Sequence, residues 1–174
     1  MYNTGMTKTS HDSETPAQGQ QVITAVALIC HSFDGVIKVF LPKRADTKKF
    51  LPGIYELPGG HIDFGENIVT GLKRELKEEL EIDVRIGDPF AVFDYANPIK
   101  GSHSVEVIYF ASLLDSPDDI VLHPDDHSSS VWVTKDELHL VANDEKGEDD
   151  PEFKAIKKAF SLLEGNSPDF AVLQ

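Results

Sequence analysis

The chain has 174 residues, a length typical of one domain, and 40% of them are hydrophobic, so a sizeable core can form. Thirty acidic residues against 16 basic ones give a net charge of −14, which argues against general binding to nucleic acids or anionic membranes. A small anionic ligand remains compatible with this charge if metal ions mediate the contact. Neither an apolar stretch of the ~20 residues needed to span a membrane nor the apolar region of a signal peptide is present, so a cytoplasmic protein is expected.

The first part of the chain predicts a leader followed by two strands. Residues 1–20 are polar and predict a disordered leader, which leaves residues 21–174 as a single domain. Residues 21–33 and 35–44 are predicted strands, joined by the turn sequence SFDG. Because the first of them has apolar residues on both faces, a central strand is expected. Residues 45–60 then form a loop with a Pro-Gly pair and a Pro-Gly-Gly.

The rest of the chain predicts a helix, further strands and a closing helix. Over residues 67–80, apolar side chains recur at helical spacing, at Val69, Leu72, Leu76 and Leu80. The elements expected after this helix are strands at 83–96 and 102–114 around a loop at 97–101, short strands at 120–123 and 130–133, a short helix at 134–141 and a closing helix at 149–163. This order predicts an α/β fold with a mixed sheet between helices.

Three glutamates of the predicted helix share one face. At about 100° per residue, Glu75, Glu78 and Glu79 lie beside the apolar stripe rather than opposite to it. A run of this kind alone is more typical of a solvated helix surface. Here, however, Gly59 and Gly60 precede the helix and allow close approach of the backbone to a ligand. Carboxylate and carbonyl oxygens are the ligands that suit Mg²⁺ or Mn²⁺.

These residues resemble the signature of the Nudix hydrolases. The flanking sequences LPGGH and FGE are also typical of that family. The match consists of Gly60, five residues, Glu66, seven residues, and then Arg74-Glu75-Leu76-x-Glu78-Glu79-x-x-Ile82. One position departs from the signature, because its late glycine is Glu81 here. Glycine suits a left-handed helix end, so either Glu81 is strained in that conformation or the helix closes differently; strain is the expectation.

The resemblance implies a fold, a reaction and a set of metal ligands. The fold would be a Nudix-like α/β/α sandwich, and the reaction would be hydrolysis of a diphosphate linkage in a nucleotide with Mg²⁺ or Mn²⁺ as cofactor. Glu75, Glu78, Glu79 and the Gly60 carbonyl would hold the metal. One of the glutamates, with Glu78 and Glu75 as candidates, or an acid from a distant loop would act as general base. A structural role is implied for Arg74, paired with Glu66.

Residues outside the signature are candidates for the rest of the site. Asp126, together with Asp125, precedes a tryptophan-containing strand where many relatives carry an acidic ligand or base, although aspartate also favours turns. The remaining candidates are substrate-binding residues. Arg44 and Lys43 could meet phosphates or be solvated charges at a strand end, and His61 could touch a phosphate or cap the loop. Tyr95, Tyr55 and Phe93 could stack on a base, although core packing is the expectation for Phe93.

Two classes of function follow from the resemblance. The first is an enzyme that hydrolyses either a nucleoside triphosphate, including an oxidised one, or a nucleoside diphosphate joined to another group such as ADP-ribose. The second is a catalytically silent Nudix-fold module that binds or senses nucleotides. The intact set of glutamates favours the enzyme. The expected partner is a small nucleotide rather than a nucleic acid or a membrane, and a homodimer is also compatible with the sequence.

Overall fold

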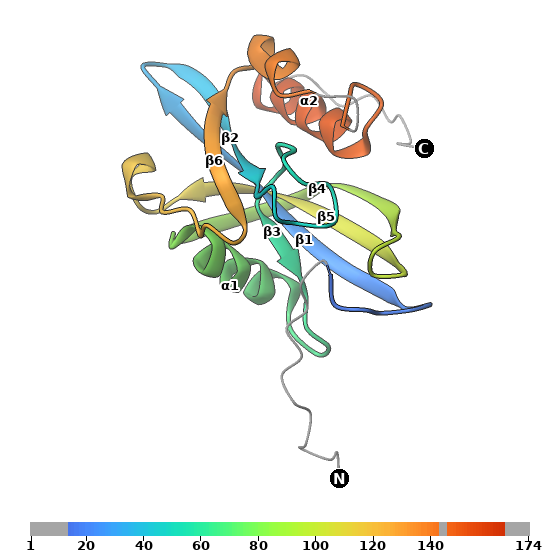
Figure 1. The fold of residues 1–174 in the computed structure, drawn as a ribbon. Coiled ribbons are helices and arrows are strands. Elements are labelled where there is room, and N and C mark those ends of the chain that lie inside the picture. The colour runs from blue at the N-terminus through green and yellow to red at the C-terminus, as the bar shows by residue number, and fades with distance from the viewer. Residues whose placement is uncertain (1–13, 143–145, 166–174) are drawn as a thin grey trace.

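The computed structural model describes residues 14–142 and 146–165. A six-stranded sheet forms the centre of the molecule (Figure 1). Five strands lie in the order β4-β5-β1-β2-β6, and β3 pairs with β1 beside them. The strands are β1 (Gln21–Phe33), β2 (Val36–Arg44), β3 (Gly59–His61), β4 (Val84–Asn97), β5 (Ser102–Leu113) and β6 (His127–Val133).

Strand β1 is the central strand of this sheet, as its two apolar faces predict. It runs parallel to β5 on one edge, and it pairs antiparallel with β3 and then with β2 on the other. The β2–β6 and β4–β5 pairs are antiparallel. The predicted mixed sheet is therefore confirmed.

One helix packs on each face of the sheet. Helix α1 (Ile68–Leu80) and helix α2 (Pro151–Leu163) lie on opposite sides of it in Figure 1. Alternate side chains of β1 separate accordingly, since Leu28 packs in the cluster that contains α2, whereas Ala27 and Ile29 pack in the cluster that contains α1. The α/β/α sandwich is thus confirmed. Neither described helix is long and apolar enough to cross a membrane.

The ends of α1 are fixed by local chemistry. The Asn67 side chain accepts hydrogen bonds from the backbone N–H groups of Val69 and Thr70, which satisfies donors that the first turn leaves open. At the other end, Glu81 has φ 57° and ψ 17°, the left-handed conformation that glycine adopts most easily. The expected strain is therefore located at the one position that departs from the signature.

Replacing Glu81 by glycine should stabilise the protein by about 1 kcal/mol, because glycine has no Cβ to clash in this conformation. The comparison is Glu81→Ala, which keeps a Cβ and should give no such gain. Thermal or urea unfolding of the three proteins measures the difference. A glycine variant less stable than the wild type would show that the left-handed residue is not strained.

The structure corrects two predicted elements. Residues 120–123 do not form a strand; instead, the Val121 N–H donates to the Leu80 carbonyl at 3.0 Å and the His123 N–H donates to the Glu79 carbonyl at 2.8 Å. This segment therefore satisfies carbonyl groups at the end of α1 that have no partner within the helix. The short helix predicted at 134–141 is a 3₁₀ helix, η2 (Lys135–Leu140), and a second one, η1 (Pro117–Asp119), was not predicted.

The predicted leader lies partly outside the described residues. Residues 1–13 are not described, and neither are residues 143–145 and 166–174 of the predicted domain. Residues 14–20 contact the folded part, since the Ala17 N–H donates to the Lys100 carbonyl at 2.9 Å and the Gly19 N–H donates to the Gly101 carbonyl at 3.0 Å. The contacts of the folded part therefore begin before Gln21.

Candidate active site

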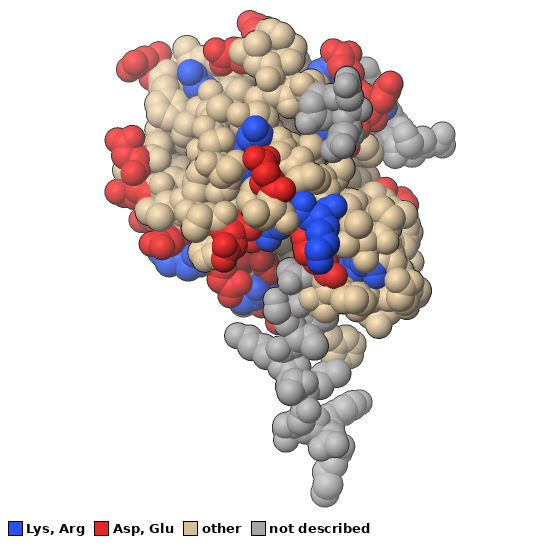
Figure 2. Space-filling model, in the orientation of Figure 1, with Lys and Arg blue, Asp and Glu red and all other residues tan. Residues whose placement is uncertain are grey.

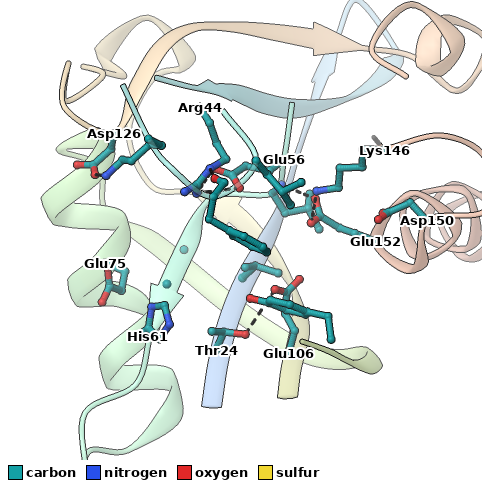
Figure 3. Close-up of a pocket in the computed structure, with 18 of the residues that line it drawn as sticks. Thr24, Arg44, Glu56, His61, Glu75, Glu106, Asp126, Lys146, Asp150 and Glu152 are labelled. Atoms are coloured by element: carbon teal, nitrogen blue, oxygen red, sulfur yellow. Dashed lines mark hydrogen bonds and ion pairs between the residues drawn. The ribbon is translucent and has the colours of Figure 1, made fainter. Parts of the chain in front are cut away.

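A pocket of about 370 Å³ opens where the sheet, α1 and the start of α2 meet. Figure 3 shows Glu75 and His61 on the side formed by α1 and β3, and Glu152 and Asp150 on the side of α2. Arg44 and Glu56 lie between these two sides. Side chains that lie far apart in the sequence thus line one cavity.

The Gly-Gly pair brings β3 against two of the predicted metal ligands. A Cβ on Gly60 would lie 2.7 Å from Oε2 of Glu75, so only glycine lets this carboxylate lie directly against the strand. At Gly59, φ is 137° and a Cβ would lie 2.3 Å from the Ala25 carbonyl oxygen. The Gly59 N–H donates to Oε2 of Glu79 at 3.1 Å. Glu75 and Glu79 therefore meet the Gly-Gly backbone at the pocket wall.

The carboxylates of this wall lie in an environment that disfavours their charge. Burial raises the pKa of Glu75 to about 7 despite the neighbouring Arg74. Burial also raises the pKa of Glu79 well above its ordinary value, and the charges of Glu56, Glu75 and Asp126 raise it further. A cation placed among these carboxylates would offset both the cost of burying their charge and the repulsion between them, and would lower their pKa values.

Arg74 connects Glu66, in the loop before α1, with glutamates of the helix itself. Its guanidinium donates to both oxygens of Glu66, at 3.1 and 3.0 Å, to Glu75 at 2.8 Å and to the His61 carbonyl at 3.1 Å. It also donates to Glu78 at 3.3 Å. The side chain of Glu78 is 59% exposed and does not line the pocket, in contrast to Glu75 and Glu79. Of the three glutamates predicted to share one helix face, Glu75 and Glu79 therefore line the pocket and Glu78 does not.

The kinds of atoms at this wall are suitable ligands for a divalent cation. Glu75, Glu79 and the glycine backbone offer oxygen ligands, and burial, which raises the pKa of both carboxyls, disfavours their negative charge in the absence of a cation. Within residues 14–142 and 146–165, no three His, Cys, Asp or Glu side chains are grouped closely enough to form a complete metal site. Glu78, held by Arg74, is the member of the predicted set that lies apart.

Arg44 lines the pocket, and Lys43 does not. The Arg44 guanidinium donates to both oxygens of Glu56, at 3.0 and 3.2 Å, and its Nε donates to the Phe50 carbonyl at 3.1 Å. Burial opposes the charge of Glu56, but Arg44 and then His127 hold the pKa of this carboxyl below its usual range. Arg44 is therefore an ion-pair partner at the pocket rather than an isolated cation.

Asp126 also lines the pocket. Its carboxylate contacts Lys48 Nζ at 2.7 Å and His123 Nδ1 at 3.2 Å. Its backbone N–H donates to the His123 carbonyl at 3.0 Å, so the residue also forms the turn that its type favours. The charge of Asp126 reaches Glu79, which places it at the same end of the pocket.

Aromatic side chains form another part of the wall. Tyr95 and Phe50 stack with ring centroids 6.0 Å apart and planes 11° apart, and Phe93 packs at 6.2 Å from Tyr95. All three line the pocket, as does the buried side chain of His61. Tyr55 packs against the core beneath α2 and does not line the pocket.

Sequence reasoning missed several charged residues of the pocket, among them Glu56, Glu106 and Glu152. A signal for Glu106 existed, because Ser102, Ser104 and Glu106 occupy alternate positions, and therefore one face, of β5 and are buried. A polar row on a central strand indicates a face that lines a cavity. No comparable pattern surrounds Glu152, which the fold brings to the pocket from α2.

Comparison with known proteins identifies the family of the chain. The family profile described as the NUDIX domain matches residues 21–156. The chain is 30% identical over 115 residues to the uncharacterized Nudix hydrolase YfcD of Escherichia coli, covering 66% of this chain and 60% of YfcD. It is 29% identical over 140 residues to the m7GpppN-mRNA hydrolase NUDT17 of Homo sapiens, covering 72% of this chain and 42% of that protein.

A solved structure gives the same fold. The binary complex of the Ap4A hydrolase of C. elegans superposes with a TM-score of 0.63 at 25% identity, covering 83% of this chain and 98% of that one. The chain belongs to the Nudix hydrolase family. It spans 42% of the length of NUDT17 and 60% of that of YfcD, so it matches only part of these curated relatives.

Proposed function

We propose that the chain hydrolyses a diphosphate linkage in a nucleotide, with Mg²⁺ or Mn²⁺ held at the β3–α1 wall of the pocket. The observation that carries this proposal is the meeting of Glu75 and Glu79 with the Gly59-Gly60 backbone in one cavity. Glu75, Glu79, Glu78 and the Gly60 carbonyl would hold the metal. A divalent cation bound there supplies charge neutralisation for the phosphates and lowers the pKa of the attacking water.

The remaining residues of the pocket have roles that follow from their positions. Arg74 orients the glutamates through its bonds to Glu66, Glu75 and the His61 carbonyl. Asp126 lies close enough to influence Glu79 and is, with the helix glutamates, a candidate for the general base. The aromatic wall with Tyr95 offers a surface on which a base can stack.

The charge distribution favours a small substrate. On the face drawn in Figure 2, basic side chains lie beside acidic ones rather than in a continuous basic tract over the described residues. A long nucleic acid would need such a tract, whereas a metal-bound nucleotide would not. By analogy with the Ap4A hydrolase and the wider family, we propose two substrate classes. One is nucleoside triphosphates, and the other is nucleoside diphosphates joined to another group.

A panel of nucleotides tests the proposal. The purified chain is incubated with Mg²⁺ and, separately, with the common and oxidised nucleoside triphosphates, ADP-ribose and a dinucleoside tetraphosphate, and the products are identified by mass. We expect cleavage between two phosphates of at least one compound. If every compound stays intact while calorimetry shows that one of them binds, the chain is a binding module and not an enzyme.

A further inference from the structure

Glu106 of β5 is a buried acid in the pocket, apart from the wall formed by β3 and α1. It is 6% exposed and lines the pocket, and Figure 3 shows it beside Thr24, below the groups that come from α2. Its Oε2 accepts a hydrogen bond from the Thr24 hydroxyl at 3.4 Å. Its Oε1 has no hydrogen-bond partner among the described residues. Because a buried polar atom without a partner is costly, this carboxyl points to a ligand.

The surroundings of Glu106 favour its protonated form. Burial and then the charge of Glu152 raise the pKa of this carboxyl, against the opposite effect of Lys146, to about 8. Below about pH 8 the group therefore carries an O–H and can donate as well as accept. Groups of several elements face it: Glu152 and Asp150 at α2, Lys146 before α2, Glu56 before β3, and Tyr95 on β4.

The wall next to Glu106 suits a flat ring. In the antiparallel β4–β5 pair, Phe93 lies opposite Glu106, and Tyr95 lies opposite Ser104, two residues away on β5. Tyr95 stacks with Phe50, and Phe93 continues this aromatic surface. A heteroaromatic base packed there would bring its polar edge to the carboxyl. Glu75, one of the proposed metal ligands, lies across the pocket from Glu106 (Figure 3), on the side where the proposed function places the phosphates.

We propose that Glu106, as a neutral carboxylic acid, donates a hydrogen bond to a ring nitrogen or carbonyl oxygen of the substrate's base and makes the enzyme selective for that base. Rotation about the last side-chain torsion can turn either oxygen toward the base, because this torsion is soft. The inference rests on the proposed nucleotide hydrolysis and adds to it the recognition of the base. Glu106 is a binding residue in this account and takes no part in the chemical step.

The test compares Glu106→Gln and Glu106→Leu with the wild type. The substrates are the best nucleotide of the panel and the base-free ribose 5-phosphate ester with the same phosphates. Glutamine keeps the shape and one donor, whereas leucine removes both polar atoms. At pH 7, the leucine variant should raise KM for the nucleotide by about tenfold, the size of one hydrogen bond, with kcat little changed. Its kinetics on the base-free ester should match those of the wild type.

The pH dependence gives a second readout. In the wild type, KM for the nucleotide should rise above about pH 8 by up to about tenfold per pH unit, because ionisation removes the donor. In Glu106→Gln, KM should stay close to the wild-type value at pH 7 and show no such rise. Glu148→Gln, at an 80% exposed side chain on the surface, is the matched control. Calorimetric titration with the nucleoside 5′-monophosphate measures the same contact without turnover, and thermal melts verify folding.

The outcomes separate the two proposals. If the wild type cleaves a nucleotide but Glu106→Leu leaves its KM unchanged, the role of Glu106 is wrong and the proposed function stands. If Glu106→Gln loses affinity as strongly as Glu106→Leu, the neutral donor is wrong. A wild type that cleaves nothing in the panel overturns the proposed function, and a nucleoside monophosphate that binds Glu106→Leu as tightly as the wild type overturns base recognition independently.

Discussion

Replacing Glu79 by glutamine is expected to lower kcat by about three orders of magnitude while the fold stays intact. Glutamine keeps the size of the side chain and can still accept the Gly59 N–H bond, but it removes the negative charge that a divalent cation would need. Steady-state kinetics at saturating Mg²⁺ measure the loss. A variant with near-normal kcat would place the metal elsewhere.

Stability without metal provides an independent measure of the same variant. Burial and the charges of Glu56, Glu75 and Asp126 raise the pKa of Glu79, so its ionised form destabilises the folded chain above the ordinary glutamate range. Glu79→Gln should therefore melt at a higher temperature than the wild type in chelator at pH 7.

Glu78→Gln should lower kcat as strongly as Glu79→Gln if Glu78 is also a metal ligand. The control on the same helix end is Glu81→Gln, which should leave kcat unchanged.

Removing Arg74 is expected to have the largest effect on stability. Arg74→Ala should lower the free energy of unfolding by about 1–3 kcal/mol, because Glu66 and Glu75, with side chains only 17% and 16% exposed, would lose their charged partner. Activity should fall as well, since the loop and the helix are no longer joined. Urea unfolding and kcat measure the two effects.

Two further variants sharpen this prediction. Arg74→Lys keeps the charge but cannot reproduce the forked contact with Glu66, so it should recover only part of the stability. Arg85→Ala removes an exposed arginine and should leave stability almost unchanged. An Arg74→Ala protein as stable as the Arg85→Ala protein would contradict the structural role of Arg74.

The sequence was sufficient for much of the fold because its signals are local. The apolar stripe of α1 and the two apolar faces of β1 each depend on a few neighbouring residues. The left-handed residue at Glu81 was also predictable, because one position of a recognisable pattern lacked its glycine. The strand expected at 120–123 was wrong, since its backbone instead bonds to the end of α1, a contact that depends on tertiary structure.

The site was predictable in the signature and, outside it, at Arg44, Asp126 and Tyr95, which were candidates from the sequence and line the pocket. Helical spacing placed Glu75 and Glu79 on one face, and the resemblance to the signature identified them and Gly60 as candidate ligands. The pairing of Arg44 with Glu56 and the orientation of Glu78 toward Arg74, by contrast, depend on the folded chain. Glu106 and Glu152 meet at the pocket from β5 and α2, 46 residues apart by number, and no local pattern connects them. Which side chains from distant elements meet at the pocket can be determined only from the structure.

The measurement that tests the central claim most directly is turnover of the best nucleotide of the panel with and without metal. Because the proposed ligands at the β3–α1 wall are all oxygens, cleavage should stop in EDTA and return when excess Mg²⁺ or Mn²⁺ is added. The same titration on Glu79→Gln should restore little activity. Full turnover in EDTA, by protein shown by elemental analysis to hold no metal, would contradict the account.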